Sequence, residues 1–100
     1  MARARIPIPA EALADFCRRN HIRRLSLFGS VLRDDFGPNS DVDVLVEFEP
    51  DHIPGLAFFA MQDELSAILG RRVDLNTAGF ISPLFRDDVL AEADALYESP

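Results

Sequence analysis

Strict alternation between residues 42 and 48 is the sequence feature that most limits how this chain can fold. Val42, Val44, Val46 and Phe48 fall on one face of an extended segment, and two carboxylates fall on the other. A period of two is typical of a β-strand with one buried face. The 100 residues are therefore expected to form a single domain, 1–100, around a sheet that buries one side.

The neighbouring segments supply the other elements of this domain. Apolar residues at helical spacing predict helices over residues 10–20 and 56–69. Shorter alternating runs predict strands over residues 23–28 and 72–76. After an N-terminal arm of residues 1–9, this order predicts an α/β (α+β) domain, a small twisted sheet with helices on one face.

Two further helices are predicted from their first residues. Ser30 is a suitable N-cap for a short helix over residues 31–35. A last helix is predicted to begin at Ser82-Pro83, because serine suits the N-cap and proline the first helical position. Its expected inner face consists of Phe85, Val89, Ala93 and Leu96.

Charge and composition exclude several classes of function. Seventeen acidic residues outnumber ten basic ones, and the net charge of -7 argues against broad nucleic-acid binding. The basic group Arg18, Arg19, Arg23 and Arg24 is interpreted as a solvated helix end, with a phosphate- or partner-binding patch as the alternative. No apolar stretch suits a membrane or a secretory signal. The single Cys17 is expected to be buried, and the expected compartment is the cytoplasm.

Three carboxylates are predicted to meet on the polar face of the sheet. Asp41 and Asp43 are two residues apart, so their side chains leave the same face. Asp74 has the matching parity on its own strand, and the three converge if the two strands are neighbours. Hard oxygen ligands favour Mg²⁺, which proteins hold through a few carboxylates and substrate phosphates.

The Gly29-Ser30 pair predicts an anion site near these carboxylates. Glycine permits a tight turn and a close backbone approach, and a helix opening at Ser30 would offer free N–H groups to a phosphate. A cation site and a phosphate site together are what nucleotidyl transfer requires.

The spacing of these residues resembles a known signature. Gly29-Ser30 is followed by ten residues and then by Asp41-Val42-Asp43, which is similar to the GS-x10-DxD pattern of polymerase-β-like nucleotidyltransferases. The segments 27–30, 40–48 and 69–75, with a terminal helix ending near 96–98, resemble the minimal nucleotidyltransferases (MNT) of that superfamily.

This resemblance implies a mixed sheet with flanking helices and a set of residue roles. Asp41, Asp43 and Asp74 would be catalytic and would hold one or two Mg²⁺ ions, and Asp74 could also receive the proton of the attacking hydroxyl. Gly29 and Ser30 would hold the triphosphate. The other residues expected at the nucleotide are Arg33 and Ser40.

The resemblance also implies a partner. MNT proteins similar to this one typically act as antitoxins beside a HEPN-domain RNase toxin, and transfer AMP from ATP to a toxin tyrosine. A hetero-oligomer without direct nucleic-acid contact is therefore expected. Relatives often carry Gly-Ser-Arg-Ala-Arg-Gly at the turn, whereas this chain has Val31 and Asp34 in place of the first arginine and the last glycine. Both changes are expected to weaken nucleotide binding.

Two alternative functions are kept. One is transfer to a small hydroxylated molecule, although no residues are left for the helical acceptor domain usual in such enzymes. The other is a non-catalytic antitoxin that blocks its partner by contact alone, which the loss of arginine at Val31 keeps open.

Two smaller groups carry weaker expectations. His21 and His52 are interpreted as two exposed loop histidines, because no cysteine or second histidine lies at ligand spacing in the sequence. Leu56, Phe59 and Ala60 are expected to complete the core, with an exposed apolar patch for a partner as the alternative.

Overall fold

The computed structural model describes residues 6, 8–32, 37, 40–52, 54–81 and 83–99, apart from the side chains of Ser30 and Phe80. The elements are α1 (Ala10–Arg19), β1 (Ile22–Phe28), the 3-10 turn η1 (Gly29–Leu32), β2 (Val42–Phe48), α2 (Ala57–Leu69), β3 (Val73–Asn76), the 3-10 turn η2 (Ala78–Phe80), α3 (Arg86–Glu92) and β4 (Asp94–Glu98). Within these ranges no helix has the length and apolarity needed to cross a bilayer.

The four strands form one mixed sheet in the order β3-β2-β1-β4. β1 is antiparallel to both β2 and β4, and β2 is parallel to β3. The parallel β2–β3 connection runs through α2, as a crossover between parallel strands requires. The predicted helices 10–20 and 56–69 and the three predicted strands are confirmed, each to within one residue at either end.

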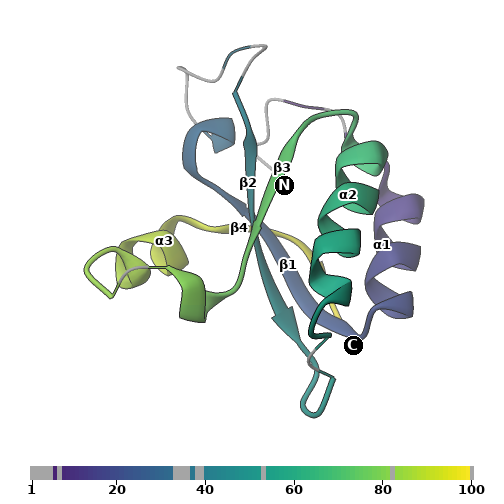
Figure 1. Ribbon diagram of the computed structural model, residues 1–100. Helices are drawn as coiled ribbons and strands as arrows, with labels where there is room; N and C mark the ends of the chain where they lie inside the picture. The colour runs from purple at the N-terminus through teal and green to yellow at the C-terminus, as the bar shows by residue number, and fades with distance from the viewer. Residues whose placement is uncertain are drawn as a thin grey trace.

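α1 and α2 lie side by side on one face of the sheet, whereas α3 lies on the other side (Figure 1). The core between the two helices and the sheet includes the inward residues of all three predicted strands. Cys17 is fully buried there as expected, and burial raises the pKa of its thiol to about 12. The mixed sheet with α1 and α2 on one face is the expected fold, with α3 as an addition to the second face.

The predicted last helix is wrong in its second half. α3 ends at Glu92, the ψ of Ala93 is 135°, and residues 94–98 form β4 instead of a further helical turn. A strand over residues 94–98 stabilises the sheet more than a further helical turn would, because β4 pairs with the edge of β1 that would otherwise stay open. Ser82 lies outside the described residues, and the helix begins at Arg86 after a turn that contains Pro83.

The predicted inner stripe of that helix is wrong for Phe85, whereas Leu96 does pack against the core, but from β4. α3 has no buried residue, and Phe85 is 59% exposed. Leu84 and Leu90 are also largely exposed, so α3 presents apolar side chains to solvent. Figure 1 shows α3 on the opposite side of the sheet from α1 and α2. The apolar periodicity of α3 therefore does not mark a face that packs in the core.

Three smaller expectations are also corrected. Leu56, Phe59 and Ala60 do not complete the core, because all three are exposed near the start of α2. The polar face of the sheet is not open along its whole length, since Ser26 and Leu45 are each only 2% exposed there. The short helix expected over residues 31–35 begins earlier, as the 3-10 turn η1 from Gly29, so Ser30 lies inside it and is not an N-cap.

Three of the four arginines in the basic group near α1 are paired with carboxylates. Arg19 contacts Asp15 at 2.9 Å and Glu64 at 2.6 Å. Arg23 contacts Glu47 at 2.8 Å, and Arg24 contacts Glu98 at 3.0 Å. These pairings favour the interpretation as a solvated surface over a phosphate-binding patch.

Candidate active site

Asp43 stands in a row of residues that crosses the sheet near the start of β2. Its Cα partner on β1 is Phe28, and its partner on β3 is Asp74. Because side chains alternate, both aspartates leave the sheet on the face opposite Val44 and Leu75, which belong to the core. The expectation that β2 and β3 are neighbours, with Asp74 beside Asp43, is confirmed.

Gly29 allows the Asp43 carboxylate to lie against the backbone of the η1 turn. Gly29 directly follows β1 and has a φ of +76°, which L side chains rarely adopt. A Cβ atom at this position would also collide with Oδ2 of Asp43. Conformation and space therefore both favour glycine at this position.

A second acidic side chain, which sequence reasoning missed, reaches the same turn from α3. Glu92 accepts a hydrogen bond from the N–H of Gly29, with an N···O distance of 3.2 Å. The cause is the strand that follows α3: Asp94 pairs with Leu27, so the residues just before Asp94 come to lie beside the residues just after β1. Recognising β4 in the sequence would have pointed to Glu92.

A groove of about 730 Å³ is lined by residues of both this turn and α3. Its lining combines apolar and acidic residues: Phe28, Gly29, Phe85, Asp88, Val89, Ala91 and Glu92. The exposed ring of Phe85 therefore borders the groove that contains the Gly29 turn.

Asp41 is the outermost of the three predicted aspartates. It lies one residue before β2 and is exposed, with Oδ1 3.6 Å from Nε of Arg72. Among the residues that the structure describes, Asp41, Asp43 and Asp74 do not form a group of three ligand atoms within 4.8 Å of one another. Mg²⁺ needs no such cage, because a few carboxylates hold it together with water and substrate phosphates. The oxygen donors therefore suit this ion, although the structure does not bring the three carboxylates together as predicted.

The turn that leads into Asp41 is fixed by Arg71, another residue that sequence reasoning missed. The Gly37 N–H donates to Oγ of Ser40 at 3.0 Å, and the Ser40 N–H donates to the Gly37 carbonyl at 3.1 Å. Nη2 of Arg71 donates to the carbonyls of Gly37 and Ser40 at 2.7 and 3.2 Å. The hydroxyl of Ser40, predicted to contact nucleotide, thus closes this turn.

The structure describes the remaining predicted nucleotide residues only in part. The backbone of Ser30 lies in η1, but its side chain, Arg33 and Asp34 lie outside the described residues. Val31 is fully buried in the core, which gives a physical reason for the missing arginine at this position. A charged side chain at this position would have to be buried away from water with no group to pair with it.

The chain matches a known family over most of its length. The model of the nucleotidyltransferase domain matches residues 10–96. The chain belongs to this family. It is also 37% identical over 75 residues to a candidate protein adenylyltransferase of Methanocaldococcus jannaschii, across 75% of this chain and 80% of that protein.

Solved structures of toxin–antitoxin complexes share the fold of this nucleotidyltransferase. A toxin–antitoxin complex with AMP-PNP matches with a TM-score of 0.72 at 22% identity, over 92% of this chain and 75% of that chain. A complex of an MNT antitoxin with a tri-AMPylated HEPN toxin from Shewanella oneidensis gives 0.63 at 22% identity, over 90% and 70%.

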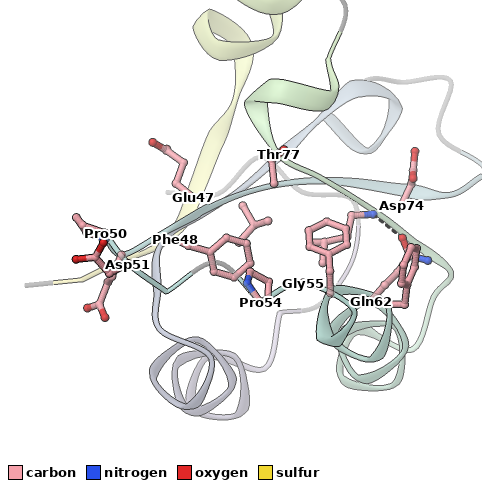
Figure 2. A pocket seen from close by; sticks show the side chains of 14 residues that line it. Glu47, Phe48, Pro50, Asp51, Pro54, Gly55, Gln62, Asp74 and Thr77 are labelled. Carbon is pink, nitrogen blue, oxygen red and sulfur yellow. Dashed lines mark hydrogen bonds between the residues drawn. The ribbon is translucent and has the colours of Figure 1, made fainter.

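The nucleotidyltransferase has a second groove, of about 780 Å³, beside α2 (Figure 2). Phe48 and Pro54 line it, and Gln62 accepts a hydrogen bond from the Leu75 N–H at 2.9 Å. Figure 2 shows the carboxylate of Asp74 pointing away from α2, on the other side of β3. Asp74 is one of the lining residues of this groove, but its carboxylate points away from α2.

The two histidines of the nucleotidyltransferase are exposed, as expected, but they are not separate. The rings of His21 and His52 stack with centroids 3.9 Å apart and planes 13° apart. Glu49 lies beside them, with Oε2 3.5 Å from Nδ1 of His21. Sequence spacing did not predict this contact, because the fold brings together two loops that are distant in the sequence.

Proposed function

We propose that this nucleotidyltransferase transfers AMP from ATP to a hydroxyl of a partner protein. One observation carries the proposal: the carboxylate of Asp43 lies against the Gly29 turn, with Asp74 as its neighbour across the sheet. Carboxylates for a cation and a glycine turn for phosphates thus occur within one row of the sheet. The proposed active unit is the single domain of residues 1–100.

Asp41, Asp43 and Asp74 are the proposed ligands for Mg²⁺, as one or two ions. The bound cation would neutralise negative charge on the phosphates and so favour attack at the α-phosphorus. Gly29, Ser30, Arg33 and Ser40 are the proposed nucleotide contacts.

The proposed reaction forms one bond and breaks one bond. The acceptor oxygen bonds to the α-phosphorus of ATP, and the bond from this phosphorus to the oxygen that bridges the α- and β-phosphates breaks. Pyrophosphate leaves with that electron pair. Asp74 is proposed to take the proton of the acceptor hydroxyl, because its exposed carboxylate stands beside Asp43 and open to an incoming group.

The proposed acceptor is a tyrosine of a HEPN-type RNase, so that the domain acts as an antitoxin in a hetero-oligomer. The named relatives and the fold shared with an MNT–HEPN complex support this assignment. The exposed apolar residues Leu84, Phe85 and Leu90 give α3 a surface suited to a protein partner beside the Gly29 groove. We assign the reaction to the cytoplasm, where ATP is available and a lone thiol stays reduced.

A second candidate function is an antitoxin that acts by contact alone. The hydrogen bond from Gly29 to Glu92 favours it, because this carboxylate uses an N–H group that a phosphate would need. Transfer requires Glu92 to release that group, whereas contact inhibition does not.

An assay with labelled ATP distinguishes AMP transfer from inhibition by contact alone. We would incubate the domain with Mg²⁺, labelled ATP and its HEPN partner, and locate the label by mass spectrometry. Asp43→Asn and Asp74→Asn should strongly slow the labelling of tyrosine, whereas Asp63→Asn, at an exposed aspartate of α2, should not. If Asp43→Asn inhibits the RNase as well as the wild type does, contact inhibition replaces transfer as the function.

A further inference from the structure

The feature that carries a further inference is the group of His21, Glu49 and His52. Each offers one ligand atom, and these three atoms all lie within 4.8 Å of one another. The group lies where β1 begins and β2 ends, whereas Gly29 and Asp43 lie at the opposite end of the same strand pair. Six residue steps along β1 separate the two ends by roughly 20 Å.

Main-chain hydrogen bonds hold the three residues in place. The Glu49 N–H donates to the carbonyl of His21 at 2.9 Å, which extends the β1–β2 ladder by one step. The His52 N–H donates to the carbonyl of Glu49 at 3.1 Å and closes a four-residue turn. Pro50 is the second residue of this turn, and Asp51 is the third, with a φ of +68°, as in a type II turn. The backbone therefore sets the positions from which all three side chains start.

The side chains converge from these fixed positions. The two imidazoles stack, and Nδ1 of His21 lies 3.5 Å from Oε2 of Glu49. The His21 and Glu49 side chains are 52% and 39% exposed, so water can supply further ligands. An ion between the stacked rings requires their planes to open, which exposed side chains can do by rotation about their χ angles.

The surrounding charges also favour a cation. A hollow of about 260 Å³ beside the rings is lined by His21, Asp51 and His52, and Arg19 also lines it. The charge of Arg19 is matched by Asp15 and Glu64. Asp51 adds a carboxylate to this hollow and no unmatched cation stands among its described lining residues.

We infer that His21, Glu49 and His52 form a binding site for a divalent transition-metal ion, with Zn²⁺ as the best match. Two imidazoles and one carboxylate are a common donor set for Zn²⁺, which leaves a fourth position for water. Imidazole suits Zn²⁺, Co²⁺ and Ni²⁺, whereas Mg²⁺ prefers oxygen ligands. The ion ties the α1–β1 turn to the loop after β2 and stabilises this end of the sheet.

The test measures zinc binding to the full chain without a histidine tag, in excess Mg²⁺ so that the oxygen ligands are occupied. Isothermal titration should give one Zn²⁺ per chain, and Zn²⁺ should raise the Tm. His21→Asn and His52→Gln should each weaken zinc binding by more than about tenfold, because loss of an outer-shell partner alone costs about 10- to 100-fold. Asparagine is chosen because His21 has a φ of +55°, which asparagine tolerates.

Asp43→Asn and Asp63→Asn are the matched controls, and both should bind zinc like the wild type. Unchanged Tm values without zinc show that the histidine variants are folded. The inference is overturned if the wild type binds no zinc, or if both histidine variants bind it as tightly as the wild type. It is also overturned if Asp43→Asn removes the binding, since the ion then sits at the other end of the sheet.

Discussion

The two ends of the β1–β2 pair gather their polar groups in different ways. At one end, strand alternation puts Asp43 and Asp74 on one face, and Gly29 makes room for a carboxylate against the backbone. At the other end, His21, Glu49 and His52 come from a turn and a loop. The first end offers oxygen donors alone and the second offers mainly imidazole nitrogen. The same strand pair can therefore present two chemically distinct sites, which respond to different ions.

The largest expected effect separates the two ends by substitution. Asp43→Asn should lower the rate of AMP transfer by about 10²- to 10³-fold, the usual cost of removing one group that stabilises developing charge. Zinc affinity should stay within about twofold of wild type, because the substitution lies some 20 Å from His21. Initial rates with labelled ATP and zinc titration measure the two quantities. A normal transfer rate would remove Asp43 from the reaction.

A pair of glycine substitutions tests whether the first end depends on the space that Gly29 leaves for the Asp43 carboxylate. Gly29 and Gly70 have φ values of +76° and +68°, but a Cβ meets Asp43 only at Gly29. Gly70→Ala should cost about 1–2 kcal/mol of unfolding free energy from its conformation alone. Gly29→Ala should cost more and should also abolish transfer. Urea unfolding and transfer rates check this, and equal effects of the two substitutions would show that the contact with Asp43 is unimportant.

A smaller effect is expected at the turn before Asp41. Arg71→Lys should lose one of the two hydrogen bonds to Gly37 and Ser40, because an ammonium lacks the planar fork of a guanidinium. The expected loss is about 0.5–1.5 kcal/mol of unfolding free energy, with a raised KM for ATP. Arg18→Lys is the control, since Arg18 is an exposed residue of α1. Similar losses of unfolding free energy in both variants would show that the hydrogen bonds of Arg71 do not stabilise this turn.

The smallest expected effect is a pH dependence of stability that involves neither end of the strand pair. Burial raises the pKa of Cys17 to about 12, so the folded state keeps the thiol protonated while the unfolded thiol ionises near pH 8.5. Stability is therefore full below about pH 8.5 and declines toward pH 12. From pH 8 to 9 the expected loss is about 0.7 kcal/mol.

Cys17→Ala should remove this loss, as measured by urea unfolding of both proteins at the two pH values. The chain has no lysine, so few other groups titrate in this range, and Tyr97 is common to both proteins. Parallel pH dependences in wild type and variant would contradict the assignment.

Sequence patterns predicted what depends on local periodicity. The alternation of residues 42–48 placed Asp43 correctly, and its parity with Asp74 predicted their common face. The segment 94–98 was mistaken for helix because its apolar spacing suits either structure, and only the open edge of β1 decides in favour of a strand. The partnership of His21 with His52 could not be predicted, since it depends on how two loops meet after the sheet forms.

The same limit applies to Glu92 and Arg71. Glu92 reaches Gly29 only because β4 returns beside β1, and Arg71 reaches the turn at Gly37 only because β3 is parallel to β2. Glu92 lies outside the segments that resemble the family, and the place of Arg71 in the segment 69–75 does not reveal its contact with the turn at Gly37.

Strand β4 also affects when the domain can finish folding. Arg24 and Glu98, partners in the β1–β4 ladder, are 74 residues apart in the chain. Closing the chain between such distant residues costs entropy before strand pairing can offset it, so this ladder forms late. During synthesis, the edge of β1 stays unpaired until residues 94–98 have left the ribosome. For that interval, the nascent chain exposes a strand edge with which a second chain could pair.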